Sequence, residues 1–287
     1  MGIIHLINGQ DGGVGKSTTA KIIADYCIDK KIPIKLFDAD RKEDVYRIYK
    51  DKYPVETAIF NEGEDYQDAA NTIYDAGVNN NVLVNLPANV FHSLSDWFDK
   101  NGIFATAEEM DVHFYNWFVT DGDPDKVINL QQNLNFFGDE CSKNILVKNY
   151  GKRKDWSDFN SDKLIKKLVK SYSLIVLELP KLLGNTEKDI ISREFLTFTE
   201  AKAYRGFSSS ISNSRIRSFV RTSFKMLDNS KIFDANEKTA SEKSISSIIK
   251  NNKDNDTTKS SIQKAVAINT NSSLNCKTID TASSKNY

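Results

Sequence analysis

The segment GQDGGVGKSTTAKI, residues 9–22, combines the residue types that bind phosphate. A phosphate loop needs small residues so that successive backbone N–H groups can surround phosphate oxygens. It also needs a lysine for the β and γ phosphates and a hydroxyl group for magnesium. The strict pattern expects glycine at position 10, where this chain has glutamine. The residues that we expect to bind a nucleotide are Gly12, Gly13, Val14, Gly15, Lys16, Ser17 and Thr18.

The flanking sequence supports this interpretation. The loop follows the apolar run IIHLIN, residues 3–8, and leads into KSTTAKIIADY, which has helical spacing. The N-terminus of that helix would add a favourable dipole for an anion. A glycine-rich turn before an ordinary helix is the alternative, and the strand and helix around the loop favour a phosphate site over it.

Short apolar runs alternate with helical patterns over the first 180 residues or so, which predicts an α/β fold with a doubly wound, mostly parallel sheet. Ligands of such sheets bind at the carboxyl ends of the strands. The predicted strands are 3–8, 32–40, 81–87, 112–119, 144–150 and 173–180. The predicted helices between them include 16–29, 64–76, 124–136 and 161–172.

Residues 212–229 have the spacing of an amphipathic helix, with Arg217, Arg221 and Lys225 at four-residue intervals on one face. This basic stripe is either a solvated helix face or a contact surface for DNA or a membrane. The chain after it is rich in Ser, Thr, Asn and Lys and poor in apolar residues, which is typical of disorder. We therefore expect a nucleotide-binding domain over residues 1–233, including the basic helix, and a disordered tail over 234–287.

Composition narrows the class of protein. The 287 residues include 39 basic and 39 acidic side chains, so the overall charge favours neither nucleic acid nor membrane as a partner. The three cysteines and three histidines are scattered, which predicts neither disulfide bonds nor a zinc site. No signal peptide or membrane-spanning run is evident, so the expected location is the cytoplasm.

Four further segments carry a resemblance: LFDAD (36–40), VLVNLPA (82–88), LVKNYG (146–151) and ELPKL (178–182). Together with the loop, they resemble the ParA/MinD family of deviant Walker A ATPases. The resemblance implies a P-loop NTPase fold, ATP and Mg²⁺ as ligands, and a homodimer. It also implies catalytic roles for Asp40, which would orient the attacking water, and Lys16. Asp38 and Ser17 would lie at the metal, and Asn149 would contact adenine.

A closer resemblance is to the plasmid StbB/TraL group of ParA-like proteins, over about residues 2–230. It is carried by NLPANVFHSLSDWF, WFVTDGDPDKV, NFFGDE, LVKNYGKRKDW and FLTFTEA. This resemblance implies a role in plasmid stability or conjugative transfer, with a plasmid-encoded partner protein.

The chain departs from the family pattern at two positions. Asp11 replaces the lysine that reaches the partner's nucleotide, and Asn85 replaces the Walker B aspartate. A carboxylate near the γ phosphate would repel it. An ATP-bound dimer would therefore have to turn Asp11 away from the phosphate, use Arg41 or Lys42 as a compensating cation, or hold Asp11 against a basic residue of the partner. We therefore expect nucleotide binding to persist while hydrolysis is slow or depends on a partner.

Three functions remain open at this point. The first is a nucleotide-dependent dimerisation switch, and the second is a non-hydrolysing adaptor that bridges plasmid DNA–protein complexes to a partner. The third is a small-molecule ligase or kinase, for which the sequence offers no additional substrate-binding constellation.

Overall fold

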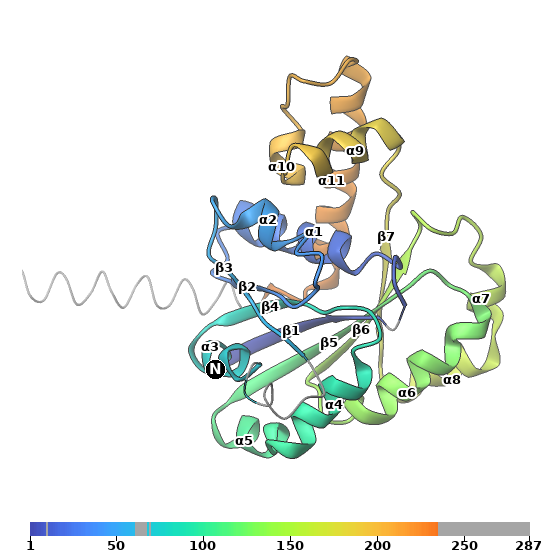
Figure 1. Ribbon diagram of the computed structural model, residues 1–287. Helices are drawn as coiled ribbons and strands as arrows, with labels where there is room; N and C mark the ends of the chain where they lie inside the picture. The colour runs from blue at the N-terminus through green and yellow to red at the C-terminus, as the bar shows by residue number, and fades with distance from the viewer. Residues whose placement is uncertain (10, 61–67, 69, 235–287) are drawn as a thin grey trace, which may run out of the picture. The chain divides into compact units, whose positions relative to one another are not determined.

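The computed structural model describes residues 1–9, 11–60, 68 and 70–234. Its centre is a seven-stranded sheet in which every neighbouring pair of strands is parallel, and this confirms the expected α/β fold. The strands follow the order β3-β2-β4-β1-β5-β6-β7 across the sheet (Figure 1). They are β1 (Gly2–Asn8), β2 (Lys35–Asp38), β3 (Val55–Thr57), β4 (Asn81–Asn85), β5 (Val112–Thr120), β6 (Lys143–Asn149) and β7 (Ile175–Leu179).

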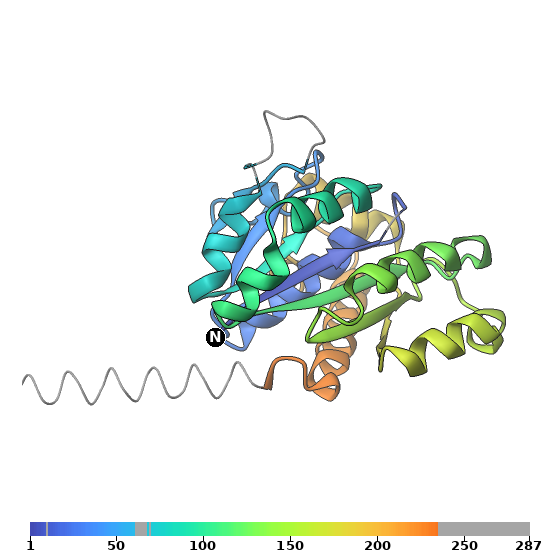
Figure 2. The same cartoon turned by 90° about the horizontal axis from the view of Figure 1, so that it is seen from below.

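Helices cover both faces of the sheet, as Figures 1 and 2 show. One face packs against α1 (Lys16–Asp29), α2 (Tyr46–Tyr49), α10 (Phe198–Ala201) and α11 (Ser210–Ser230). The other face packs against α3 (Asn71–Asn79), α4 (Phe91–Lys100), α5 (Ile103–Glu109), α6 (Val127–Phe137), α7 (Ser157–Ser161) and α8 (Lys163–Ser171). The remaining elements are α9 (Asn185–Arg193) and a 3₁₀ turn, η2 (Pro124–Lys126).

The central strand β1 shows why the apolar runs are continuous. All seven of its residues are buried, because helices cover it from both sides. Ile3 and Ile7 contribute to the core beneath α1, and Ile4 and Leu6 contribute to the core on the opposite face. In the sheet, β4, β2 and β3 lie on one side of β1, and β5, β6 and β7 lie on the other. The loop after β1 therefore lies at the switch point between the two halves, where ligands of such sheets bind.

The sequence analysis missed one strand and misplaced some boundaries. β3 has only three residues, two of them exposed, so it lacks the apolar pattern of a buried strand. The helix predicted over 64–76 begins at Asn71 as α3, and residues 64–67 and 69 of that prediction lie outside the described residues. The predicted disordered tail also lies outside them from residue 235 onward.

The predicted amphipathic helix is α11. Its side chains Ile216, Phe219, Val220 and Leu227 are buried, and a serine hydroxyl at position 209 accepts a hydrogen bond from the N–H of Ile211 at its start. The stripe of Arg217, Arg221 and Lys225 is exposed to solvent. The helix therefore belongs to the folded core, with its basic face directed outward.

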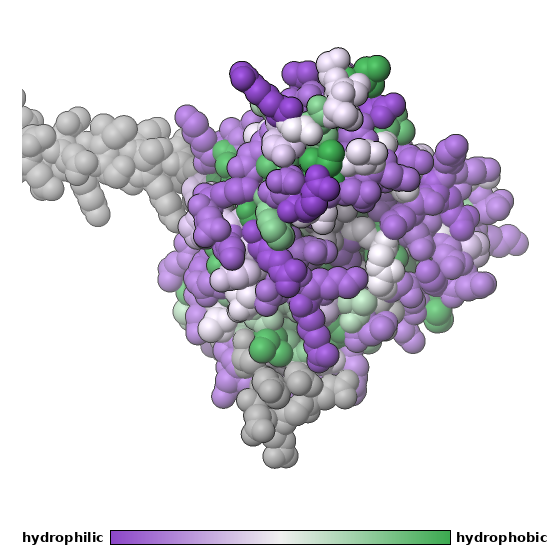
Figure 3. Space-filling view, turned by 45° about the horizontal axis from the view of Figure 1, so that its top comes forward, coloured by the Kyte–Doolittle hydropathy of each residue, from purple (hydrophilic) through white to green (hydrophobic). Residues whose placement is uncertain are grey.

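The exposed surface in Figure 3 is mostly hydrophilic, with hydrophobic side chains scattered over it. In the described part of the chain, no helix combines the length and the apolar character needed to cross a membrane. Cys27 and Cys141 are free thiols buried in the core. The three tryptophans are also buried and form part of the core.

His5 on β1 has no exposed surface. Its Nδ1 accepts a hydrogen bond from Trp117 Nε1 at 3.2 Å, and its Nε2 has no hydrogen-bond partner. Phe233 stacks on the imidazole with 5.2 Å between ring centroids. Burial lowers the pKa of His5 from 6.5 to about 3, and the charge of Lys143 adds to this effect. The imidazole is therefore neutral in the folded protein at neutral pH.

We predict that His5→Gln makes the protein less sensitive to acid. The unfolded chain protonates His5 below about pH 6.5, whereas the folded chain keeps it neutral down to about pH 3. Its contribution to stability is complete above pH 6.5 and falls by about 1.4 kcal/mol per pH unit as the pH decreases toward 3. Between about pH 7.5 and 5, the free energy of unfolding in urea should fall by about 2 kcal/mol less in the variant.

The matched control is His113→Gln, which removes a partly exposed imidazole near the start of β5. It should lose stability on acidification much as the wild type does. An equal loss in His5→Gln and in the wild type would contradict the assigned role of burial.

Candidate nucleotide site

The loop between β1 and α1 adopts backbone angles that suit glycine. Gly13 has a φ of 77° and Gly15 a φ of 116°, in the region that side-chain-bearing residues rarely adopt. A Cβ atom at Gly15 would also lie 2.2 Å from Asn149 Nδ2. Gly15 precedes α1, and no side chain caps that helix. The N–H groups of its first turn are therefore free to bind an anion.

Lys16 holds this loop from inside. Its Nζ donates hydrogen bonds to the carbonyl oxygens of Gly9 and Asp11, both at 2.8 Å, and the side chain is buried. Burial lowers the pKa of Lys16 to about 8, while the carboxylates of Asp40 and Asp11 oppose that shift. An ammonium group has three protons to donate, so one remains for a phosphate oxygen.

Asn149, at the end of β6, joins the late part of the sheet to the phosphate loop. Its Nδ2 donates to the carbonyl oxygen of Val14 at 2.7 Å, and its Oδ1 accepts from the N–H of Gly151 at 2.9 Å. The sequence analysis expected an adenine contact here. The side chain lines a pocket beside the loop, and its two hydrogen bonds also make it a clamp between the 149–151 turn and the loop.

Asp38, expected at the metal, organises the turn after β2. Its Oδ1 accepts from Asn85 Nδ2 at 2.8 Å and from the N–H of Asp40 at 3.2 Å. Its Oδ2 accepts from the N–H groups of Val45 and Tyr46 at 2.8 and 2.9 Å. Burial raises the pKa of the Asp38 carboxyl, and these four donors oppose the shift. Its hydrogen-bonding capacity is therefore largely used within the protein.

Asn85, at the end of β4, lies between Asp38 and the loop. Its Nδ2 also reaches Ser17 Oγ at 3.5 Å, while its buried Oδ1 has no hydrogen-bond partner. The bond to the Asp38 carboxylate establishes which atom of the amide is the nitrogen. The unpartnered Oδ1 and the Ser17 hydroxyl are oxygen donors of the kind that Mg²⁺ and its bound waters prefer.

These residues fit a magnesium ion that keeps most of its water. Mg²⁺ in phosphate-loop sites needs few protein ligands because phosphates and waters complete its shell. The described residues hold no cluster of three or more His, Cys, Asp or Glu side chains suited to a metal. A metal would accordingly depend on Ser17 Oγ, the phosphates and water next to Asn85 Oδ1.

Asp40 follows the Asp38 turn and is partly exposed. Its Oδ1 accepts a hydrogen bond from the N–H of Lys42 at 3.1 Å. It faces a hollow of about 720 Å³ at the carboxyl ends of β2, β3 and β4. Its carboxylate is close enough to Lys16 to raise the pKa of that ammonium group. The sequence analysis expected Asp40 to orient water near a γ phosphate, and that role stays a prediction.

Asp11 has a partner that sequence reasoning missed. Its Oδ2 lies 3.8 Å from Lys126 Nζ, and the same ammonium group lies 3.2 Å from Asp121 and 3.5 Å from Asp123. The cations considered from the sequence were Arg41 and Lys42. The structure brings Lys126 to Asp11 because β1 and β5 are neighbouring strands, so the segments that follow them meet.

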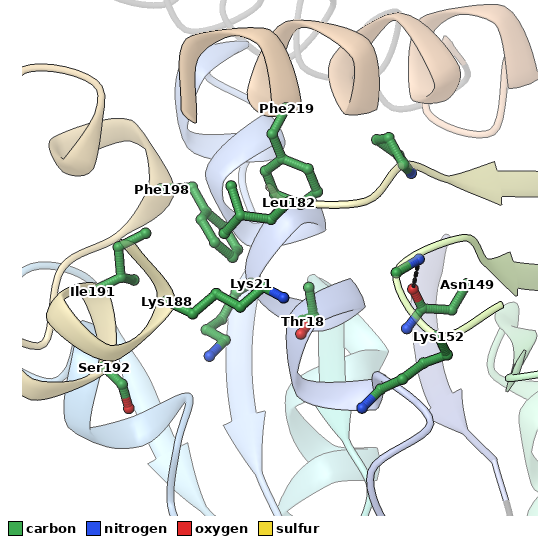
Figure 4. A pocket seen from close by; sticks show the side chains of 12 residues that line it. Thr18, Lys21, Asn149, Lys152, Leu182, Lys188, Ile191, Ser192, Phe198 and Phe219 are labelled. Carbon is green, nitrogen blue, oxygen red and sulfur yellow. Dashed lines mark hydrogen bonds between the residues drawn. The ribbon is translucent and has the colours of Figure 1, made fainter. Parts of the chain in front are cut away.

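A pocket of about 230 Å³ opens beside the phosphate loop, between α1 and the 149–152 turn (Figure 4). Thr18 is at its entrance near the loop, and Leu182, Phe198 and Phe219 form an apolar wall. Basic side chains come from three different elements: Lys21, Lys152 and Lys188. No acidic side chain lines this pocket. Most of these residues lie after position 150, and no local motif identifies them.

The strand, the glycine loop and the helix at the centre of a parallel sheet form the arrangement of P-loop nucleotide-binding proteins. The predicted site residues follow the carboxyl ends of three parallel strands, which lie on the same side of the sheet. Gly12–Thr18 follow β1, Asp38 and Asp40 lie at and just after the end of β2, and Asn149 lies at the end of β6. The structure therefore brings them together around one candidate site.

No protein-family model and no curated protein sequence matches this chain. Among solved structures, it resembles a nucleotide-binding protein from Archaeoglobus fulgidus in complex with ADP, with 10% identity and a TM-score of 0.41 over 72% of this chain and 93% of the other. The cell division ATPase MinD of Pyrococcus furiosus has 12% identity and a TM-score of 0.42, over 77% and 99% of the two chains.

A protein described as a plasmid partition protein from Borrelia burgdorferi B31, bound to AMPPNP, also has 12% identity and a TM-score of 0.42, over 77% and 98% of the two chains. The identities and TM-scores of all three structures are low, so they indicate similarity and do not establish a function for this chain.

We predict that Asn149→Ala weakens nucleotide binding by at least about tenfold, because it releases the phosphate loop from the 149–151 turn. Asn144→Ala is the matched control. It removes another buried amide of β6, whose Nδ2 donates to the Gly138 carbonyl oxygen at 2.8 Å, at the opposite end of the strand. Both variants should lose about 1–3 kcal/mol of stability. Titration with a fluorescent ATP analogue should detect weaker binding in Asn149→Ala alone, and equal affinities in the two variants would contradict the clamp.

Proposed function

We propose that this protein is an ATP-binding protein of the ParA/MinD type that acts as a nucleotide-dependent dimerisation switch. The observation that carries the proposal is the closed phosphate loop, with the Lys16 ammonium group inside it and uncapped N–H groups at the start of α1. The adjoining pocket offers an apolar wall for a flat base. The segments that resemble the StbB/TraL group support a role in plasmid stability or conjugative transfer.

The ligand in this proposal is ATP with Mg²⁺. The loop residues 12–18 bind the phosphates, Ser17 contacts the metal, and Asp38 shapes the metal side of the site through Asn85. Asp40 orients the attacking water, and Asn149 borders the base as well as the loop. Residues 1–233 form the domain that binds the nucleotide, and residues 234–287 form a tail.

Hydrolysis in this proposal is slow or depends on a partner. The carboxylate of Asp11 stands where a cation would stabilise the transition state, and Asn85 contributes no negative charge beside the metal. Both departures affect turnover more than binding, because the loop N–H groups and Lys16 are intact.

A second candidate is a nucleotide-binding adaptor without meaningful hydrolysis, which bridges plasmid DNA–protein complexes to a partner. The pairing of Asp11 with Lys126 inside one chain favours it, because Asp11 then needs no cation from a second copy. A small-molecule ligase or kinase is less well supported, because the described residues around the hollow at Asp40 form no evident binding site for a second substrate.

The partners in this proposal are a second copy of the chain and a plasmid-encoded protein, in the cytoplasm. The stripe of Arg217, Arg221 and Lys225 supplies a contact for DNA or a membrane surface. All three side chains are exposed, and within the described residues none of them forms an ion pair. Such a stripe attracts phosphate groups in a salt-dependent way.

We predict that Lys16→Ala abolishes binding of ATP·Mg²⁺ without unfolding the chain. The side chain is the ammonium group that the loop itself offers to the phosphates. Titration with a fluorescent ATP analogue measures the affinity, and circular dichroism monitors the fold. Lys42→Ala is the control, since it removes a neighbouring exposed ammonium group. Equal affinity in the wild type and Lys16→Ala would refute the phosphate-loop assignment.

We predict that Asp11→Lys strengthens ATP-dependent dimerisation by about tenfold or more, because a repulsion near the γ phosphate of the partner becomes an attraction. Asp121 and Asp123 remain to hold Lys126 in the variant. Sedimentation with and without ATP measures the dimer. A large gain in hydrolysis should also require Asn85→Asp, and the two changes should be coupled because they act on the same phosphate and metal.

The control for this experiment is Asp123→Lys, which makes the same change of charge in the same cluster but outside the phosphate loop. It should leave dimerisation unaltered. Weakened dimerisation in Asp11→Lys would mean that Asp11 pairs with a basic residue across the interface. A chain that stays monomeric with ATP in every variant would refute the switch and favour the adaptor.

A further inference from the structure

β7 is the last strand at one side of the sheet, and no further strand pairs with it in the described part of the chain. Its residues alternate between two environments. Leu177 and Leu179 are buried on the side of α11, whereas Val176 and Glu178 point to the other face. Val176 is 40% exposed, which is unusual for a large apolar side chain on a strand of a buried sheet.

The helix that covers this face stops short of β7. Ile165 and Leu168 of α8 pack in one cluster with Phe118 of β5 and Leu146 of β6. A groove of about 270 Å³ is therefore left between α8 and β7. Its apolar lining residues are Leu146, Phe159, Ile165, Val169 and Val176.

The rim of the groove is basic. Lys166 and Lys170 line it from α8, and Lys148 lines it from β6. Lys148 is paired with Glu178 at 2.8 Å. The α8 lysines differ, since none of them forms an ion pair with another described residue. The helix carries four lysines and no acidic residue: Lys163, Lys166, Lys167 and Lys170.

We propose that this groove binds an extended segment of a partner protein that carries both apolar and acidic side chains on one face. Such a segment would add a strand at the edge of β7. Side chains two positions apart share one face of a strand, so apolar and acidic residues at every second position would lie on Val176 and near Lys166 and Lys170. The groove lies on the far side of β6 from the pocket beside the phosphate loop, and the proposal does not depend on nucleotide binding.

The charge of the groove favours an acidic partner segment over a second copy of the chain and over the residues of this chain after 234. A second copy paired through β7 about a twofold axis would place the α8 lysines of both copies near one another, which is unfavourable. The residues of this chain after 234 carry eight lysines against five acidic residues, so they share the sign of the groove. An acidic, partly apolar segment complements both the rim and the floor.

The test uses the full chain and a short fluorescein-labelled peptide with valine and glutamate in turn at every second position and threonine between them. Fluorescence anisotropy measures its binding. Wild type should bind this peptide more tightly than a peptide with lysine in place of glutamate. Lys166→Glu/Lys170→Glu should weaken binding by at least about tenfold, because both rim charges are reversed. Val176→Thr keeps the β-branched shape and should also weaken binding, because it removes an apolar contact.

The matched control is Lys163→Glu/Lys167→Glu, which reverses two charges at the same spacing on α8 but outside the groove. It should retain the affinity of the wild type to within about threefold. An equal loss in both double variants, or no binding of the valine–glutamate peptide to the wild type, would overturn the proposal. Duplex DNA that displaces the peptide with the same dependence on Lys166 and Lys170 would also overturn it, in favour of nucleic acid. Circular dichroism of all variants verifies that they are folded.

Discussion

The two hydrogen bonds from Lys16 to the carbonyl oxygens of Gly9 and Asp11 are the interaction on which the candidate site depends. They bring an ammonium group inside a turn of backbone, next to the start of α1, which has no side-chain cap among the described residues. The cost of burying that charge, seen in the lowered pKa of Lys16, is offset because carbonyl oxygens and two carboxylates surround it. A phosphate would replace part of this environment with a full negative charge.

Asp38 and Asn85 form a second polar centre, at the carboxyl ends of β2 and β4. Asn85 Nδ2 donates to Asp38 Oδ1 at 2.8 Å, a contact that a second carboxylate could make only with a proton or a metal between the two groups. The amide therefore stabilises the turn after β2 without any ligand. In the proposed ATPase, an amide at this position contributes no negative charge beside a metal, so the contact that stabilises the turn would also slow hydrolysis.

Asp11 changes the charge on the other side of the phosphate loop, next to the segment that follows β5. Three carboxylates, those of Asp11, Asp121 and Asp123, share the single ammonium group of Lys126, so this cluster retains net negative charge beside the loop. These ion pairs are partly exposed and each contributes little to stability. In the proposed function, a cation that completes the phosphate site would come from outside this cluster, for example from a partner molecule.

Local sequence determined the phosphate loop and six of the seven strands, because glycine spacing and runs of buried apolar residues act over a few residues. It could not predict β3, whose three residues lie at an exposed edge. Only the tertiary structure decided that Asn149 clamps Val14 and that Lys126 pairs with Asp11, since these contacts join residues more than a hundred positions apart. Which distant side chains meet depends on strand order, and strand order is set by packing of the whole sheet and is not encoded in any short segment.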